Sequence, residues 1–218
     1  MHHSAALVPA GSANPETRQR IAGANLLGVC VTALAVIQAA EDQRRRRAGI
    51  GAVTDPELLD LLLQLPVAVA VSDPVTWAET ADQPAAVIGR DGDGLTVTRH
   101  LTPPLSIRDV IVTASAGREL RAVQDASLFA GFARRWVAIA QHRVREAVLL
   151  EAKLCGVGLL DSSGQVVLGS DQPPPRTDRW AWMLQEKAYR RWLSRQSPAH
   201  ATASQPPATA SATGGQTG

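Results

Sequence analysis

IAGANLLGVCVTALAVIQAA, the stretch from Ile21 to Ala40, contains no charged residue. Arg18 and Arg20 lie just before it, and a run of four arginines follows shortly after it. An uncharged stretch of this length has to be buried, either in a lipid bilayer or in the core of a soluble domain. The choice between these two environments decides where the protein works.

The residues around this stretch predict one long helix over residues 16–47. Asn14 suits the N-cap, Pro15 suits the first turn, and Glu16 complements the positive end of the helix dipole. We expect the helix to continue to Gly49, a residue type that commonly ends helices. At 1.5 Å per residue it would extend about 45 Å, which exceeds the usual length of a helix in a globular protein.

A transmembrane helix is our first interpretation of residues 21–40. A bilayer core needs about 20 mostly apolar residues, and this stretch supplies them. The four cations that follow, Arg44, Arg45, Arg46 and Arg47, would keep the C-terminal side in the cytoplasm. We therefore expect the protein in the inner (cytoplasmic) membrane, with its C-terminal domain in the cytoplasm.

A buried helix of a soluble, cytoplasmic protein is the alternative. Asn25 and Gln38 interrupt the apolar window, and no Trp or Tyr marks either edge, as the aromatic belts of membrane helices do. A stripe of small and weakly polar residues along one side is typical of a core helix that faces a crowded neighbour. The arginine run is then either a solvated helix end or a set of phosphate contacts with nucleic acid.

The composition narrows the broad class of protein. The 218 residues suffice for one ordinary domain with tails, and an apolar share of 45% excludes wholesale disorder. A net charge of +2 gives no global attraction to nucleic acid or anionic lipid, so any such attraction must come from local clusters. Cys30 and Cys155 are interpreted as buried free thiols. No cofactor, metal site or small-molecule substrate is expected from the sequence.

The remaining segments predict an α+β fold. A leucine-rich helix begins at Pro56, capped by Thr54 or Asp55, and Pro66 ends it. A second long helix over 128–153 has one apolar side and is expected to pack on a small, mainly antiparallel sheet. The strands of that sheet are predicted near 67–71, 85–88, 95–98, 109–113, 154–160 and 166–168.

A third helix over 179–195 concentrates aromatic and basic residues. Trp180, Leu184, Ala188 and Trp192 recur every four residues, so this face is predicted to dock on the core. The cations and rings on the other faces suit a partner protein, a membrane interface or nucleic acid. The candidate partner-binding residues are Arg179, Trp182, Lys187, Tyr189, Arg190, Arg191 and Arg195.

These expectations divide the chain into five parts. A disordered arm covers 1–14, the long apolar helix covers 15–48, and the α+β domain covers 49–172. A proline spacer and the helix rich in Trp and Arg cover 173–196. The tail 197–218 lacks the apolar residues that would offset its ordering entropy, so it is expected to be disordered.

Three functions follow from the sequence, in order of preference. The first is a non-enzymatic, single-pass membrane-anchored accessory protein of a bacterial type, whose cytoplasmic domain binds protein partners. The second is a soluble nucleic-acid-binding protein that uses the arginine run and the 179–195 helix, with an affinity that falls steeply with salt. The third is a metal-dependent nuclease built on Glu151 and Lys153, a spacing that matches half of a metal-site pattern.

Overall fold

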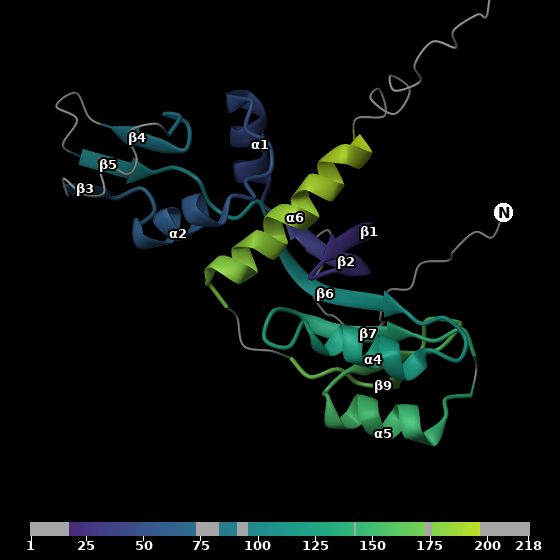
Figure 1. Ribbon diagram of the computed structural model, residues 1–218. Helices are drawn as coiled ribbons and strands as arrows, with labels where there is room; N and C mark the ends of the chain where they lie inside the picture. Colours follow the sequence, from purple (N-terminus) through teal and green to yellow (C-terminus); the bar gives the residue numbers. More distant parts are fainter. Residues whose placement is uncertain (1–17, 73–82, 91–95, 142, 173–175, 197–218) are drawn as a thin grey trace, which may run out of the picture.

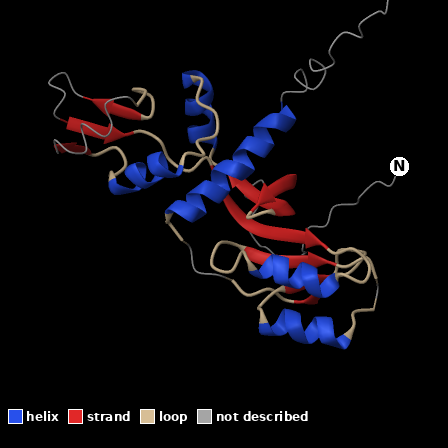
Figure 2. Ribbon diagram, in the orientation of Figure 1, coloured by secondary structure: helices blue, strands red, loops and turns tan. Residues whose placement is uncertain are grey.

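The computed structural model describes residues 18–72, 83–90, 96–141, 143–172 and 176–196. Over these residues the chain forms a six-stranded mixed sheet, a separate three-stranded sheet and the helices that pack on them (Figures 1 and 2). The predicted α+β class is therefore confirmed. The expected arm over 1–14, the proline spacer and the tail over 197–218 lie outside the described residues.

The apolar stretch is a β-hairpin, so the prediction of one helix over 16–47 is wrong. Strand β1 (Arg18–Leu26) pairs antiparallel with β2 (Val29–Ile37). Between them Leu27 and Gly28 have φ of 51° and 81°, which gives the tight turn that matches the twist of paired strands. Only the end of the predicted helix is helical, as α1 (Ala39–Ala48), which Gly49 terminates at a φ of 67°.

The hairpin explains why so long a stretch carries no charge. It forms two neighbouring strands of one sheet, and buried residues from both strands enter the same core. None of the helices among the described residues is long and apolar enough to cross a membrane. The prediction of a single-pass membrane anchor is therefore wrong, and the expected inner-membrane location loses the observation on which it rested.

The large sheet has the strand order β1-β2-β6-β7-β8-β9. Its remaining strands are β6 (Leu105–Thr113), β7 (Arg134–Ala138), β8 (Gly158–Leu160) and β9 (Val166–Leu168). The pairs β6–β7 and β7–β8 are parallel, and the other pairs are antiparallel. The parallel pairs are linked by helices α4 (Glu119–Ser127) and α5 (Glu146–Leu154), as parallel neighbours require.

The prediction of a second long helix over 128–153 is also wrong. Gly131 has a φ of 84° and lies in the turn that follows α4. The chain then forms β7, whose residues from Arg135 to Ala138 are almost wholly buried. A short apolar run buried in a sheet cannot be told from a helix segment by its periodicity alone, and here the strand is the outcome.

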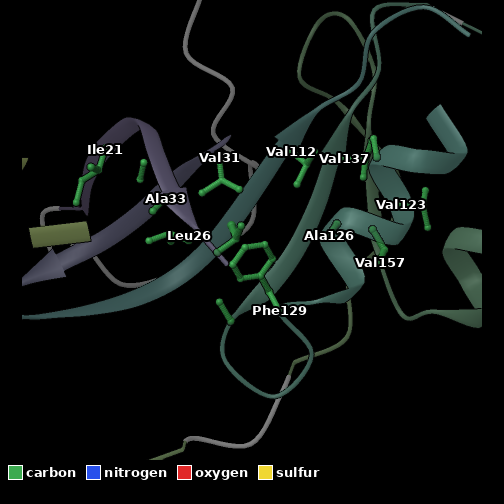
Figure 3. Close-up of a cluster of buried hydrophobic side chains, with 14 of the residues drawn as sticks. Ile21, Leu26, Val31, Ala33, Val112, Val123, Ala126, Phe129, Val137 and Val157 are labelled. Carbon is green, nitrogen blue, oxygen red and sulfur yellow. The ribbon is translucent and has the colours of Figure 1, made fainter. Parts of the chain in front are cut away.

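Helices α4, α5 and α6 (Arg179–Gln196) contribute to one core with the large sheet. Phe129, just after α4, lies among residues of the β1–β2 hairpin and the central strands in Figure 3. Helix α6 adds Leu184, Ala188 and Tyr189 to the same core. The predicted helix over 179–195 is confirmed as α6.

The segment between β2 and β6 forms a smaller unit. Helix α2 (Pro56–Gln64) begins where predicted, with the side chain of Asp55 accepting hydrogen bonds from two backbone N–H groups. The strands β3 (Ala70–Ser72), β5 (Thr96–Arg99) and β4 (Ile88–Arg90) form an antiparallel sheet in that order. The strand predicted over 67–71 is the short edge strand β3.

Helix α6 connects the two units. Its Trp182 and Met183 lie in the core of the smaller unit with Leu59, Leu62 and neighbouring apolar residues, while its next turns enter the core of the large sheet. In Figure 1 the helix runs between α1 and α2 on one side and β1, β2 and β6 on the other. One helix therefore holds both units, and one of its sides remains open to solvent.

Candidate nucleic-acid interface

The arginine run predicted as a phosphate contact is largely occupied inside the protein. Arg45 is fully buried, and its guanidinium donates to both carboxylate oxygens of Glu186 on α6 at 2.7 and 2.9 Å. Its Nε donates to Glu41 at 2.7 Å. A guanidinium with 0% exposure and two carboxylate partners cannot reach a ligand, so Arg45 is a structural residue.

The Arg45–Glu186 pair belongs to a buried polar network. Glu186 also accepts hydrogen bonds from Trp182 Nε1 and from the backbone N–H of Val53, both at 2.9 Å. Burial lowers the pKa of Arg45, but its pairs with Glu186 and Glu41 outweigh burial and hold the pKa above its ordinary value. A buried ion pair is tolerated when its remaining polar atoms are satisfied in this way.

The neighbouring arginines are only partly free. Arg44 donates to Glu41 at 2.8 Å and to the carbonyl oxygen of Ala86 at 2.6 Å. Arg46 pairs with Asp42 at 3.0 Å and lies 5.3 Å from the ring centre of Trp192. Arg47 is exposed. Three of the four cations are thus held by acids one turn earlier in α1 or by Glu186 of α6.

Two aromatic residues predicted to meet a partner lie in the core instead. Trp182 is 2% exposed and Tyr189 is 0% exposed. Burial raises the pKa of Tyr189 well above the ordinary tyrosine value, and the hydrogen bond from its hydroxyl to Asp42 at 2.8 Å raises it further. Both side chains join α6 to its neighbours and lie inside the core.

The open side of α6 carries charge of one sign. Arg190, Arg191 and Arg195 are exposed and Lys187 is half-buried, whereas Glu186, the single acid of the helix, is buried. At four-residue intervals, Lys187, Arg191 and Arg195 follow one side of the helix at a spacing of about 6 Å. We call Lys187, Arg190, Arg191 and Arg195 the basic face.

Strand β1 adjoins the basic face. Nε of Arg191 donates to the carbonyl oxygen of Ala22 at 3.3 Å, and its guanidinium lies against Gly23, where a side chain would crowd it. Arg20, two residues before Ala22 on the same strand, is exposed. The strand thus fixes the position of one cation of the face and adds another beside it.

Trp180 lies at the beginning of the same helix and is 50% exposed. The guanidinium of Arg179 lies 5.0 Å from the ring centre of Trp180, and Arg179 also forms an ion pair with Asp60 of α2. The four-residue spacing predicted that Trp180 faces the core, so Trp180 was not among the predicted site residues. Its exposure could have been inferred from Ala181, Leu184 and Ala188, whose spacing defines the buried side without it.

The candidate nuclease residues lie elsewhere. Glu151 and Lys153 are on α5, and Glu151 accepts a weak hydrogen bond from Cys155 Sγ at 3.8 Å. Within the described parts of the chain, no three His, Cys, Asp or Glu residues gather as a metal site would require. Cys155 is half-buried and Cys30 is exposed, and both are free, so the prediction of a buried thiol is wrong for Cys30.

A cavity of about 530 Å³ opens beside the first turn of α1. Its lining includes Glu41, Arg44, His100, Ser106 and Gln185. The volume is within the range of small-molecule sites, but the two charged groups of this lining are already paired with each other. The cavity therefore offers no unpaired charge comparable to the cations of the basic face.

Comparison of the chain with protein-family models, curated proteins and solved structures gave no match.

Proposed function

We propose that the protein binds nucleic acid through the basic face of α6. The observation that carries this proposal is the sign of the exposed charge: Lys187, Arg190, Arg191 and Arg195 share the open side, and Glu186 is withdrawn into the core. Contacts from lysine and arginine to phosphates dominate the affinity of proteins for nucleic acid. Because the net charge of the whole chain is only +2, this concentration of cations is a local feature of one helix and does not follow from the overall charge.

Trp180 favours an unpaired strand over a duplex. Its ring is half exposed at one end of the helix, and the basic face begins two turns further on. Single-strand binders combine a track of cations with aromatic rings on which bases stack. The arrangement on α6 has both parts on one rigid element, so the ring would take a base while the cations contact successive phosphates.

The proposal gives the arginine run of α1 no direct part. Arg45 is buried, and Arg44 and Arg46 already have carboxylate partners. Contacts to phosphate position a nucleic acid and carry no sequence information. We therefore expect affinity without strong sequence preference.

The test measures binding of a fluorescein-labelled single-stranded oligonucleotide by anisotropy over a series of salt concentrations. With four cations in contact, the slope of log K against log salt is expected to be roughly −3 for a single strand. A duplex of the same length is expected to bind more weakly. Binding that does not change with salt would overturn the proposal.

Paired variants separate the basic face from charge in general. The variant Lys187→Ala/Arg190→Ala/Arg195→Ala leaves Arg191 and its bond to β1 in place, and we expect at least a tenfold loss of affinity and a shallower salt slope. The control Arg118→Ala/Arg121→Ala/Arg143→Ala removes three exposed cations at the α4 and α5 end of the large sheet. Equal losses in the two triple variants, at unchanged melting temperatures, would contradict an interface on α6.

A further inference from the structure

Helices α4 and α5 expose an unusual number of leucines. Leu149, Leu150 and Leu154 of α5 are 38%, 58% and 75% exposed, and Leu120 and Leu128 at α4 are 40% and 50% exposed. We call these five residues the leucine face. Single exposed apolar residues are ordinary, whereas a group on adjoining elements marks an interaction surface.

Helix α5 is apolar on two opposite sides. Val148 and Ala152 are buried against the large sheet. At 100° per residue, Leu150 and Leu154 lie on the far side of the helix, where a surface helix normally carries polar residues. A helix that is apolar on both sides has a second face on which a partner can pack.

The two helices that carry these leucines are neighbours. Arg145, just before α5, pairs with Glu119 of α4, so the two helices lie alongside each other. In Figure 1 α4 and α5 form one end of the molecule, and no labelled element lies beyond α5.

We propose that the leucine face binds a second copy of this chain, with the two α5 helices packed antiparallel across a twofold axis. The charges on α5 favour this occupant: Glu146 at its first turn and Lys153 at its last are both exposed. Around a twofold axis near Leu149 and Leu150, Glu146 of each copy meets Lys153 of the other. The helix dipoles also oppose each other in that arrangement.

The size of the face sets the strength of the dimer. A nine-residue helix is about 13 Å long, so the pair buries less than the roughly 800 Å² per partner of a standard interface. We expect a reversible dimer with a dissociation constant on the order of micromolar. The inference does not depend on the basic face, because α6 lies apart from α5 in Figure 1.

Sedimentation equilibrium of the full chain across the micromolar range is the first experiment. The wild-type chain is expected to pass from monomer to dimer, and Leu150→Asp to remain monomeric with at least a tenfold weaker association. Leu27→Asp is the matched control, because Leu27 is a 37% exposed leucine in the hairpin turn with a positive φ that Asp adopts readily. Its association should equal that of the wild type.

Charge reversal tests the antiparallel arrangement. Glu146→Lys and Lys153→Glu are each expected to weaken self-association several-fold, because like charges then meet across the axis. An equimolar mixture of these two variants should associate as the wild type does, since both ion pairs form again in the mixed dimer. A wild-type chain that is monomeric throughout, dimers unaffected by Leu150→Asp, or a mixture no better than its components would each overturn the proposal.

Discussion

Helices α1 and α6 each carry four arginines, and the two helices use them in opposite ways. In α1 the acids Glu41 and Asp42 precede three of the four arginines by three or four residues, so they lie on the same faces and pair with them. In α6 the single acid is Glu186, and its carboxylate is paired with Arg45 of α1. Arg190, Arg191 and Arg195 of α6 remain exposed, whereas only Arg46 and Arg47 do so in α1.

The comparison shows that the density of charge in a sequence does not locate a charged surface. The densest cationic run of the chain contains its most deeply buried cation, Arg45. Burying that cation requires an acid from elsewhere, and Glu186 supplies it from α6. The same contact removes the only negative charge from α6, so one ion pair both fixes α1 to α6 and leaves the open side of α6 purely basic.

The largest expected effect comes from breaking that ion pair. Arg45→Ala would leave Glu186 buried without its cation, and we expect a loss of about 3–5 kcal/mol in the free energy of unfolding. Urea unfolding followed by circular dichroism measures the loss. Arg47→Ala, an exposed arginine of the same helix, is the control and should change stability by less than about 0.5 kcal/mol. Equal effects of the two substitutions would contradict the structural role assigned to Arg45.

A smaller effect is expected at high pH, through Tyr189. Its folded pKa is raised above the unfolded value, so its contribution to stability is full below about pH 10 and is lost as the pH rises beyond it. Tyr189 is the only tyrosine of the chain, so tyrosinate absorbance near 295 nm reports on this residue alone.

We expect the native protein to ionise Tyr189 at a clearly higher pH than the chain in guanidinium chloride. In the unfolded chain the phenol should titrate near pH 10. Tyr189→Phe should lose the alkaline absorbance change entirely and should cost about 0.5–1.5 kcal/mol through the lost hydrogen bond to Asp42. A native titration that coincides with the unfolded one would show that the hydroxyl is open to solvent.

Part of the fold could be predicted because the hydrophobic pattern of some segments fits a helix and not a strand. The leucine helix at Pro56 has a cap, a first-turn proline and a terminating proline, and α6 combines helical spacing with good helix formers. The stretch from Ile21 to Ala40 is compatible with a helix and with a pair of strands. Its β-branched residues and Gly28 favoured a hairpin, but a length of about 20 uncharged residues matched a bilayer as well.

The site was predictable only in outline. The basic residues of α6 were identified, because a cation on a helix with few acids is usually exposed. The burial of Arg45 could not be predicted, since its partner Glu186 lies 141 residues away and only tertiary packing brings the two together. The pairing of Arg46 with Asp42 could have been inferred, because their four-residue separation is visible in the sequence.

The smallest expected effect would sharpen the contrast between the two helices. Arg46→Ala/Arg47→Ala removes two exposed cations from α1, next to α6 but outside the basic face. If phosphates contact only the basic face, the affinity for a single-stranded oligonucleotide should fall less than threefold, through long-range electrostatics that added salt suppresses. Its salt slope should stay equal to that of the wild type, because no contacting cation has been removed. A slope that falls by the same amount as in the α6 triple variant would place α1 in the interface and would abolish the distinction drawn between the two helices.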